Sequence, residues 1–148
     1  MVAKKTEAGE KPAERAPVPA LDLSAFDLQA EAERGATMPV LNPKTGAPTG
    51  ATISVYGQDA RGYRVTARRI ADEIAANFDR EPTDPDDALL LGRAREAAAA
   101  ITGWDGIAVD GELVDCTTEN AVEALRRYPW LADQVLTFIR SRGNFSAA

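Results

Sequence analysis

The sequence predicts an α+β domain that is predominantly α-helical, with two short β-hairpins and four to five helices behind a disordered N-terminal tail. Apolar residues recur at helical spacing over residues 65–78, prolines stand at two helix starts, and an Asp-Gly pair separates two short apolar runs. A chain of 148 residues has the size of one small domain. We therefore assign residues 1–20 to the tail and residues 21–148 to a single domain.

The first part of the chain leads from the tail into a hairpin. Residues 1–20 mix Lys, Glu, Ala and Pro without periodicity, which predicts disorder. Residues 21–34 predict a short helix that ends at Gly35. Beyond it, MPVLNP and GATISVYG flank the turn residues 42–50, and the β-branched residues of the second run favour a strand. This pattern predicts a two-stranded hairpin.

Two helices follow the first hairpin. Residues 65–78 have an amphipathic pattern. Its apolar face consists of Ala67, Ile70, Ala71, Ile74, Ala75 and Phe78. Prolines on both sides of Asp84 interrupt this helix, and Asp84 as N-cap with Pro85 as first residue begins the next one. We expect that helix to run through Ile101 and to stop at Gly103. Its apolar stripe is Leu90, Ala94, Ala97, Ala98 and Ile101.

A second hairpin and two more helices complete the domain. Asp110-Gly111, flanked by alternating apolar residues, suits a two-residue type I′ turn. Thr117 or Thr118 caps the helix ENAVEALRRY. A proline opens the last helix, residues 129–142, and a glycine ends it. The shared apolar face of that helix is Leu131, Val135, Phe138 and Ile139.

The composition argues against several classes of function. The chain has no histidine, which removes the commonest general base and transition-metal ligand. Its single cysteine, Cys116, cannot form an internal disulfide or a zinc cluster, and a reduced cytosolic setting is expected. A net charge of −6 disfavours nucleic-acid binding. We expect no membrane segment and no signal peptide, because no sufficiently long apolar run is present.

Two acidic runs fail the requirements of a metal or acid/base site. They are Asp79, Glu81, Asp84, Asp86 and Asp87, and Asp105, Asp110, Glu112, Asp115 and Glu119. Neither has the spacing and central glycine of a calcium-binding loop. We interpret the first as helix-start electrostatics with a solvated loop, and the second as a solvated hairpin edge. The sequence thus predicts no catalytic, cofactor or metal site, and an enzyme would have to rely on carboxylates alone.

Arginines and late aromatic residues are the candidates for contact with a partner. One basic cluster is Arg61, Arg64, Arg68 and Arg69, and another is Arg126, Arg127, Arg140 and Arg142. Each is either a solvated face paired with the acidic middle of the chain or a docking surface. The late aromatic residues belong either to the core or to an interface. The candidate protein-binding residues are Arg126, Arg127, Tyr128, Trp130, Arg140 and Phe145.

An ordered set of short segments resembles a known family over residues 38–145. The segments are MPVLNPKTGAPTGATISVYGQDARGYR before a helix, Gly103-Trp104-Asp105-Gly106, Asp110-Gly111, Thr118-Glu119-Asn120, Tyr128-Pro129-Trp130, Gln134-Val135 and Asn144-Phe145. Together they resemble the tail assembly chaperones of long-tailed, siphovirus-like bacteriophages and prophages. No single segment is specific, but their order is. The tail of this chain is longer than the resemblance leads us to expect.

The resemblance implies a protein of the infected host's cytoplasm that is usually absent from the finished virion. Such proteins bind the tape measure protein, keep it soluble and extended, and help to recruit tail tube subunits; self-association is also expected. Contact would come from the C-terminal helix pair, residues 119–142, and the neighbouring aromatic residues. The alternative is a structural component of the tail or the head–tail junction that stays in the particle.

Overall fold

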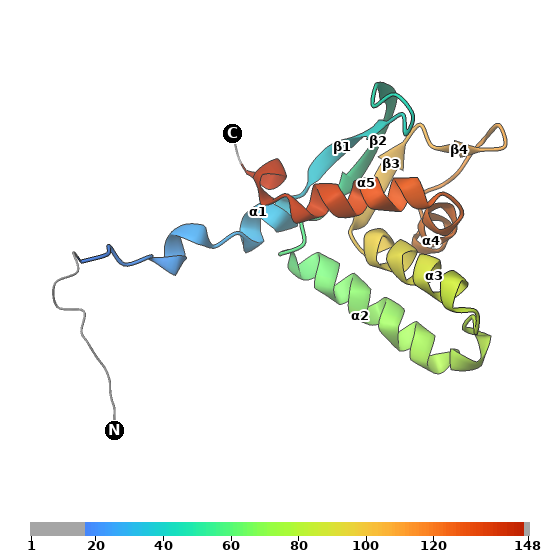
Figure 1. The fold of residues 1–148 in the computed structure, drawn as a ribbon, viewed down its shortest axis with the longest axis horizontal. Helices are drawn as coiled ribbons and strands as arrows, with labels where there is room; N and C mark the ends of the chain where they lie inside the picture. Colours follow the sequence, from blue (N-terminus) through green and yellow to red (C-terminus); the bar gives the residue numbers. More distant parts are fainter. Residues whose placement is uncertain (1–16, 147–148) are drawn as a thin grey trace.

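A three-stranded antiparallel sheet lies against a group of helices, and a small hairpin extends beside them (Figure 1). The computed structural model describes residues 17–146. Its helices are α1 (Gln29–Arg34), α2 (Arg61–Ala76), α3 (Pro85–Ala98), α4 (Thr118–Arg127) and α5 (Pro129–Arg140), with 3-10 helices η1 (Leu23–Phe26), η2 (Phe78–Arg80) and η3 (Arg142–Phe145). Its strands are β1 (Ala36–Leu41), β2 (Pro48–Val55), β3 (Ile101–Asp105), β4 (Ala108–Val109) and β5 (Glu112–Leu113). This confirms the predicted helix-rich α+β class.

One face of the sheet contributes four buried residues, Met38, Val40, Ile53 and Val55, to the hydrophobic core. The strand order is β1-β2-β3, and Met38, Ile53 and Trp104 stand opposite one another across the three strands. Because paired residues share a face, these side chains point together toward α3, α4 and α5. Thr37 and Pro39, which alternate with the buried positions of β1, are exposed. The predicted first hairpin, β1–β2, is confirmed.

The third strand was not predicted, and it shortens the alanine-rich helix. α3 ends at Ala98, and residues 101–105 form β3 beside β2 instead of a last helical turn and a stop. The Tyr56 N–H donates to the Ala100 carbonyl at 2.8 Å, which joins the end of β2 to this turn. Predicted burial of Ile101 on a helical stripe and the stop at Gly103 were therefore wrong. Pairing with a strand distant in sequence overrides the local helical pattern.

The apolar stripe of α2 is only partly covered. The helix begins at Arg61, four residues before the predicted start, and Ile70 is its buried residue. Ala71 and Ala75, which were predicted to be buried, are exposed, and Phe78 lies beyond the helix with 74% of its surface exposed. In Figure 1, α2 lies below α3 at the outer side of the helical group, and Ile70 is its buried residue.

The helix starts follow the predicted capping pattern. Asp84 accepts a hydrogen bond from the Asp87 N–H at 3.0 Å, with Pro85 as first residue of α3. Thr117, rather than Thr118, caps α4 by accepting from the Asn120 N–H at 3.0 Å. α5 begins at the predicted proline and buries Leu131, Val135 and Ile139, while Phe138 is partly buried. It ends at Arg140, two residues early, and η3 follows.

The second hairpin and the N-terminal segment agree with the sequence in part. Asp110 and Gly111 have φ angles of 52° and 86°, as a type I′ turn requires, and they join β4 to β5. The predicted helix over 21–34 is divided into η1 and α1, and α1 ends at Gly35 as expected. Of the predicted tail, residues 1–16 lie outside the described part of the chain, and residues 17–20 are exposed without helix or strand.

The core is built largely from small side chains. Its largest fully buried residues are Ile53, Leu125, Ile139, Val55 and Val135. Alanines fill much of the remainder, at positions 94, 97, 98, 100, 121 and 132. Within residues 17–146, no polar or charged residue is buried, and none of the helices has the length and apolar character to cross a bilayer. Several large apolar side chains are exposed outside this core.

Candidate protein-binding surface

A sharp corner between α4 and α5 places two aromatic side chains beside an open groove. Tyr128 leaves the helical conformation, with φ −123° and ψ 78°, because the following Pro129 disfavours a helical residue before it. Pro129 then begins α5. Tyr128 and Trp130 consequently line a cavity of about 400 Å³, together with Ile107 and Val109 of the hairpin region. We call this cavity the corner groove.

The hairpin wall of the corner groove is held by Trp104. Its indole Nε1–H donates to the Val114 carbonyl at 2.7 Å, and the Val114 N–H donates to the Ile107 carbonyl at 3.0 Å. Because Trp104 is on β3, these bonds connect the hairpin to the main sheet. The sequence analysis assigned no role to Trp104. The signal that could have pointed to it was its place in Gly103-Trp104-Asp105-Gly106, one of the segments that carry the family resemblance.

Charged groups lie at the rim of the corner groove. Arg127 is 3.7 Å from the Asp110 carboxylate at the hairpin tip, and its guanidinium lies 5.3 Å from the centre of the Tyr128 ring. Both partners of the ion pair are more than half exposed, so the pair contributes at most about 1 kcal/mol. The hairpin tip and the helix corner are thus joined by a weak, solvent-exposed ion pair.

The structure brings together some of the predicted contact residues and separates others. Arg127, Tyr128 and Trp130 meet at the corner groove, and Arg126 lies on the same turn, paired with Glu123 at 2.8 Å. Arg140 lies at the far end of α5, which is about 18 Å away for a helix of 12 residues. The six residues therefore do not form one surface.

Phe145 is a core residue, which corrects its assignment as a candidate contact. It is 4% exposed, and its ring meets Phe138 edge to face at 5.7 Å. The chain folds back after α5, and the Asn144 side chain fixes this turn by donating to the Phe138 carbonyl at 3.0 Å. Gly57 makes room, since a Cβ there would lie 3.2 Å from the Phe145 ring and 2.9 Å from Ala32 Cβ.

The C-terminal arginines pair with carboxylates of this same chain. Arg140 is 2.7 Å from Glu96, and Arg142 donates to both oxygens of Asp59, at 2.6 and 3.0 Å. The hydrogen bond from Arg142 lowers the pKa of Asp59. The sequence left two interpretations of this basic cluster, pairing with the acidic middle of the chain or docking of a partner. Arg140 and Arg142 follow the first, since both pair with carboxylates of this chain. Arg127 is exposed and pairs with Asp110, which lines the corner groove.

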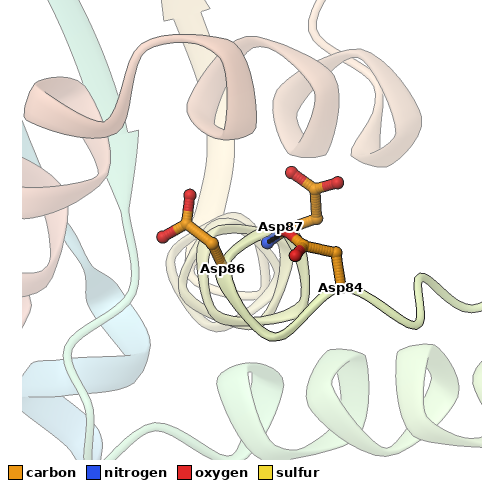
Figure 2. A group of neighbouring side chains, drawn as sticks. All are labelled: Asp84, Asp86 and Asp87. Carbon is orange, nitrogen blue, oxygen red and sulfur yellow. Dashed lines mark hydrogen bonds between the residues drawn. The ribbon is translucent and has the colours of Figure 1, made fainter.

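The first acidic run has a structural explanation. Figure 2 shows Asp84, Asp86 and Asp87 around the first turn of α3, with the Asp87 N–H directed at the Asp84 carboxylate. All three side chains are exposed, although their oxygens lie within 4.8 Å of one another. Glu81 belongs to a different contact, because Arg95 donates to both of its oxygens, at 2.6 and 2.8 Å. These arrangements stabilise a helix start and a loop.

A second apolar groove, which sequence reasoning missed, runs between β1 and α5. It has a volume of about 370 Å³ and is lined by Met38, Leu41 and Phe138, among others. Gln134 also lines it, with its side chain accepting from the Leu41 N–H at 3.0 Å and donating to the Leu41 carbonyl at 2.8 Å. These two bonds satisfy the free edge of β1 at that residue.

Cys116 does not have the surroundings of a reactive thiol. It is partly buried beside the start of α4, and burial raises the pKa of its thiol. A raised pKa keeps the sulfur protonated near neutral pH, which disfavours a nucleophilic role.

Comparison of the chain with protein-family models, curated proteins and solved structures gives no match. The resemblance to tail assembly chaperones therefore depends on the residues quoted above and on their order.

Proposed function

We propose that this protein is a phage tail assembly chaperone that binds the tape measure protein in the host cytoplasm. In this role it keeps the tape measure protein soluble and helps to recruit tail tube subunits during tail morphogenesis. The observation that carries the proposal is the corner groove, an apolar cavity bordered by Tyr128, Trp130 and Arg127. The Tyr128-Pro129-Trp130 and Asp110-Gly111 segments of the resemblance belong to this groove and its rim.

The lining of the groove suits an apolar stripe on a helix. Its walls are Ile107, Val109 and the two aromatic side chains, and aromatic residues at a rim are common anchors of protein interfaces. A helix turn that buries about 100 Å² of apolar surface gains roughly 2.5 kcal/mol. Since association itself costs about 4 kcal/mol or more, one such contact is weak.

Weak contacts are useful when many copies bind one long polymer. A tape measure chain presents repeated apolar stripes before the tail tube closes around it, so several copies can shield it together. Binding through many weak sites holds the polymer by avidity. The same weakness allows each copy to leave when tube subunits polymerise.

Co-expression with the tape measure protein of the same phage tests this function. Wild-type protein should keep the tape measure protein in the soluble fraction and co-purify with it. Trp130→Ala and Arg127→Glu should each reduce the soluble fraction, because they remove an apolar wall and reverse the rim charge. Leu89→Ala is the control, since Leu89 is apolar and 61% exposed but lies on α3, outside the groove. Equal solubilisation by folded groove variants and wild type would contradict the proposal.

Mass spectrometry of purified phage particles separates the proposal from its structural alternative. A chaperone should be absent from mature particles or present far below stoichiometric amounts. Stoichiometric amounts in the particle would identify a component of the tail or the head–tail junction instead.

A further inference from the structure

The segment before α1 exposes an unusual amount of apolar surface. Residues 17–28, which we call the arm, extend away from the rest of the molecule (Figure 1). Their large apolar side chains are exposed by 80% at Val18, 69% at Leu21, 74% at Leu23 and 60% at Phe26. The arm is locally ordered around η1, where Asp22 accepts hydrogen bonds from the Ser24 N–H and hydroxyl at 3.0 and 2.7 Å. Four large exposed apolar side chains within nine residues make the arm a candidate interaction site.

A second uncovered surface is the outer face of α2 and the turn after it. Its residues are Arg61, Arg64, Val65, Arg68, Ala71, Ala75 and Phe78. They follow one another at intervals of three or four residues, apart from the adjacent pair of Arg64 and Val65, and all are exposed. Val65 is 54% and Phe78 74% exposed. This face carries an apolar strip with basic residues at the N-terminal half of the helix.

The arm and the outer face of α2 are complementary in charge. Asp22 and Asp27 are the only charged residues between positions 17 and 28. α2 has its four arginines at positions 61–69 of its N-terminal half, whereas its two acidic residues, Asp72 and Glu73, are exposed in the C-terminal half. The acidic apolar arm therefore matches the basic N-terminal half of the outer face of α2 in charge, and the remainder of the contact would be apolar.

The direction of the arm points to a second copy as the partner. Glu33 of α1 accepts hydrogen bonds from the Gly62 N–H at 3.0 and 3.2 Å, which fixes the root of the arm at the start of α2. From this root the arm and α2 leave in opposite directions (Figure 1). With the four residues of η1 rising about 2 Å each and the other eight extended, the arm spans about 34 Å, and α2 with 16 residues is about 24 Å long. The arm is long enough to cover α2 of a neighbour.

We infer that two copies of this chain exchange arms, with each arm lying on the outer face of the other copy's α2. Val18, Leu21, Leu23 and Phe26 would pack on the apolar strip, and the two aspartates would lie near the arginines. Reciprocal exchange gives a closed dimer, because each copy supplies one arm and one helix. This dimer does not depend on binding to the tape measure protein.

The molar mass of the full chain in solution tests the exchange. Sedimentation equilibrium from low micromolar to several hundred micromolar should show a monomer–dimer equilibrium. The double variant Leu23→Asp/Phe26→Asp should raise the dissociation constant about tenfold or more, because it places charge in the buried part of the interface. Leu113→Asp is the control at a side chain that is 79% exposed on the hairpin, and it should leave the constant unchanged.

Changes on α2 should act like changes on the arm. Val65→Asp should weaken the dimer to a similar degree, with circular dichroism as the check that α2 remains folded. Asp27→Arg should weaken it about threefold to fivefold, and adding Arg68→Asp should restore part of the loss.

Mixing the two kinds of variant gives the decisive outcome. A copy with a defective arm and a copy with a defective α2 still form one intact arm–helix contact, so the mixture should dimerise where neither variant does alone. A monomer at every concentration would overturn the inference. So would a dimer that neither set of variants weakens, or a mixture that remains monomeric.

Discussion

Two glycines have opposite backbone requirements. Gly35 ends α1 with φ 79° and ψ −177°, a conformation open essentially to glycine alone. A Cβ at this position would lie 2.7 Å from the Val55 carbonyl oxygen. Gly92 stands in the middle of α3, is exposed, and a Cβ there would meet nothing within 4 Å.

Alanine substitution at these glycines should change stability in opposite directions. We expect Gly35→Ala to lower the free energy of unfolding by about 2 kcal/mol or more, through backbone strain and the close carbonyl contact. Gly92→Ala should raise it by about 0.5–1 kcal/mol, since alanine favours the helix. Urea unfolding measures both. A shift of the same sign in the two variants would contradict the conformation described for Gly35.

The Glu81–Arg95 pair is the best-shielded ion pair among the described residues. Both side chains are about one-fifth exposed, at 21% and 22%, and the guanidinium bonds both carboxylate oxygens. The hydrogen bonds from Arg95 lower the pKa of Glu81. A carboxylate with a lowered folded-state pKa stabilises the fold above its ordinary pKa, and this stabilisation is lost as the pH falls through the folded-state pKa.

Glu81→Gln should therefore destabilise the protein in a pH-dependent manner. We expect a loss of about 1 kcal/mol at neutral pH, where the carboxylate is charged. The difference from wild type should shrink as the pH falls below about 4.3, the ordinary pKa of glutamate. Glu123→Gln is the control, because Glu123 is 62% exposed in its pair with Arg126 and should show little effect at any pH. Urea unfolding at several pH values measures both; a constant difference for Glu81→Gln would count against the ion pair.

At the scale of elements, the start of α3 depends on one cap. Asp84 accepts from the Asp87 N–H, whereas Asp86 is exposed in the first turn (Figure 2). Asp84→Ala should lower the free energy of unfolding by about 1 kcal/mol. Asp84→Asn should keep most of the wild-type stability, because asparagine also caps helices. Asp86→Ala should cost only a few tenths of a kcal/mol. Equal losses for Asp84→Ala and Asp86→Ala in urea unfolding would show that the cap contributes nothing.

Elements with local signals could be predicted from the sequence, and elements that depend on distant contacts could not. The caps, the prolines and the Asp110-Gly111 turn act within a few residues, and the structure contains them where predicted. Strand β3 was missed because its alanine-rich approach continues a helical pattern, whereas its pairing partner β2 lies about fifty residues earlier. The predicted apolar stripe of α2 was right at Ile70, which is buried, and wrong at Ala71, Ala75 and Phe78, which are exposed, because the direction in which the helix leaves the core decides which edge of the stripe is covered.

The candidate site was predictable to a similar degree. Tyr128 and Trp130 were singled out because aromatic residues are scarce, and both line the corner groove. The assignment of Phe145 as a contact residue was wrong, because its burial depends on the packing of η3 against α1 and α5. Pairs such as Arg142 with Asp59 join residues 83 positions apart, which no local pattern reveals.

At the scale of the whole molecule, the core is built from small side chains while several larger apolar side chains lie on the surface. Much of the core is alanine, while larger apolar side chains lie on the arm, on α2 and around the corner groove. A domain of this size gains limited stability from its own core and can gain more by covering another apolar surface. Both proposals, shielding of a tape measure helix and arm exchange, use surface that the fold leaves uncovered.

Trp130 can report directly on the corner groove. The chain has two tryptophans, and Trp104→Phe leaves Trp130 as the only one. This change removes one hydrogen bond to Val114, at an expected loss of about 1 kcal/mol, while the ring remains to fill the core. The remaining emission then comes from a partly exposed side chain at the rim of the groove.

The most direct test is the emission of Trp130 during titration of the Trp104→Phe protein with the tape measure protein, in separate segments. We expect one or more apolar helical segments to shift the emission to shorter wavelength in a saturable manner, with a weaker response from Arg127→Glu. Segments that bind in a pull-down without changing Trp130 emission would place the contact elsewhere. Failure of every segment to bind the wild-type protein, which retains the Trp104 hydrogen bond, would contradict the chaperone function itself.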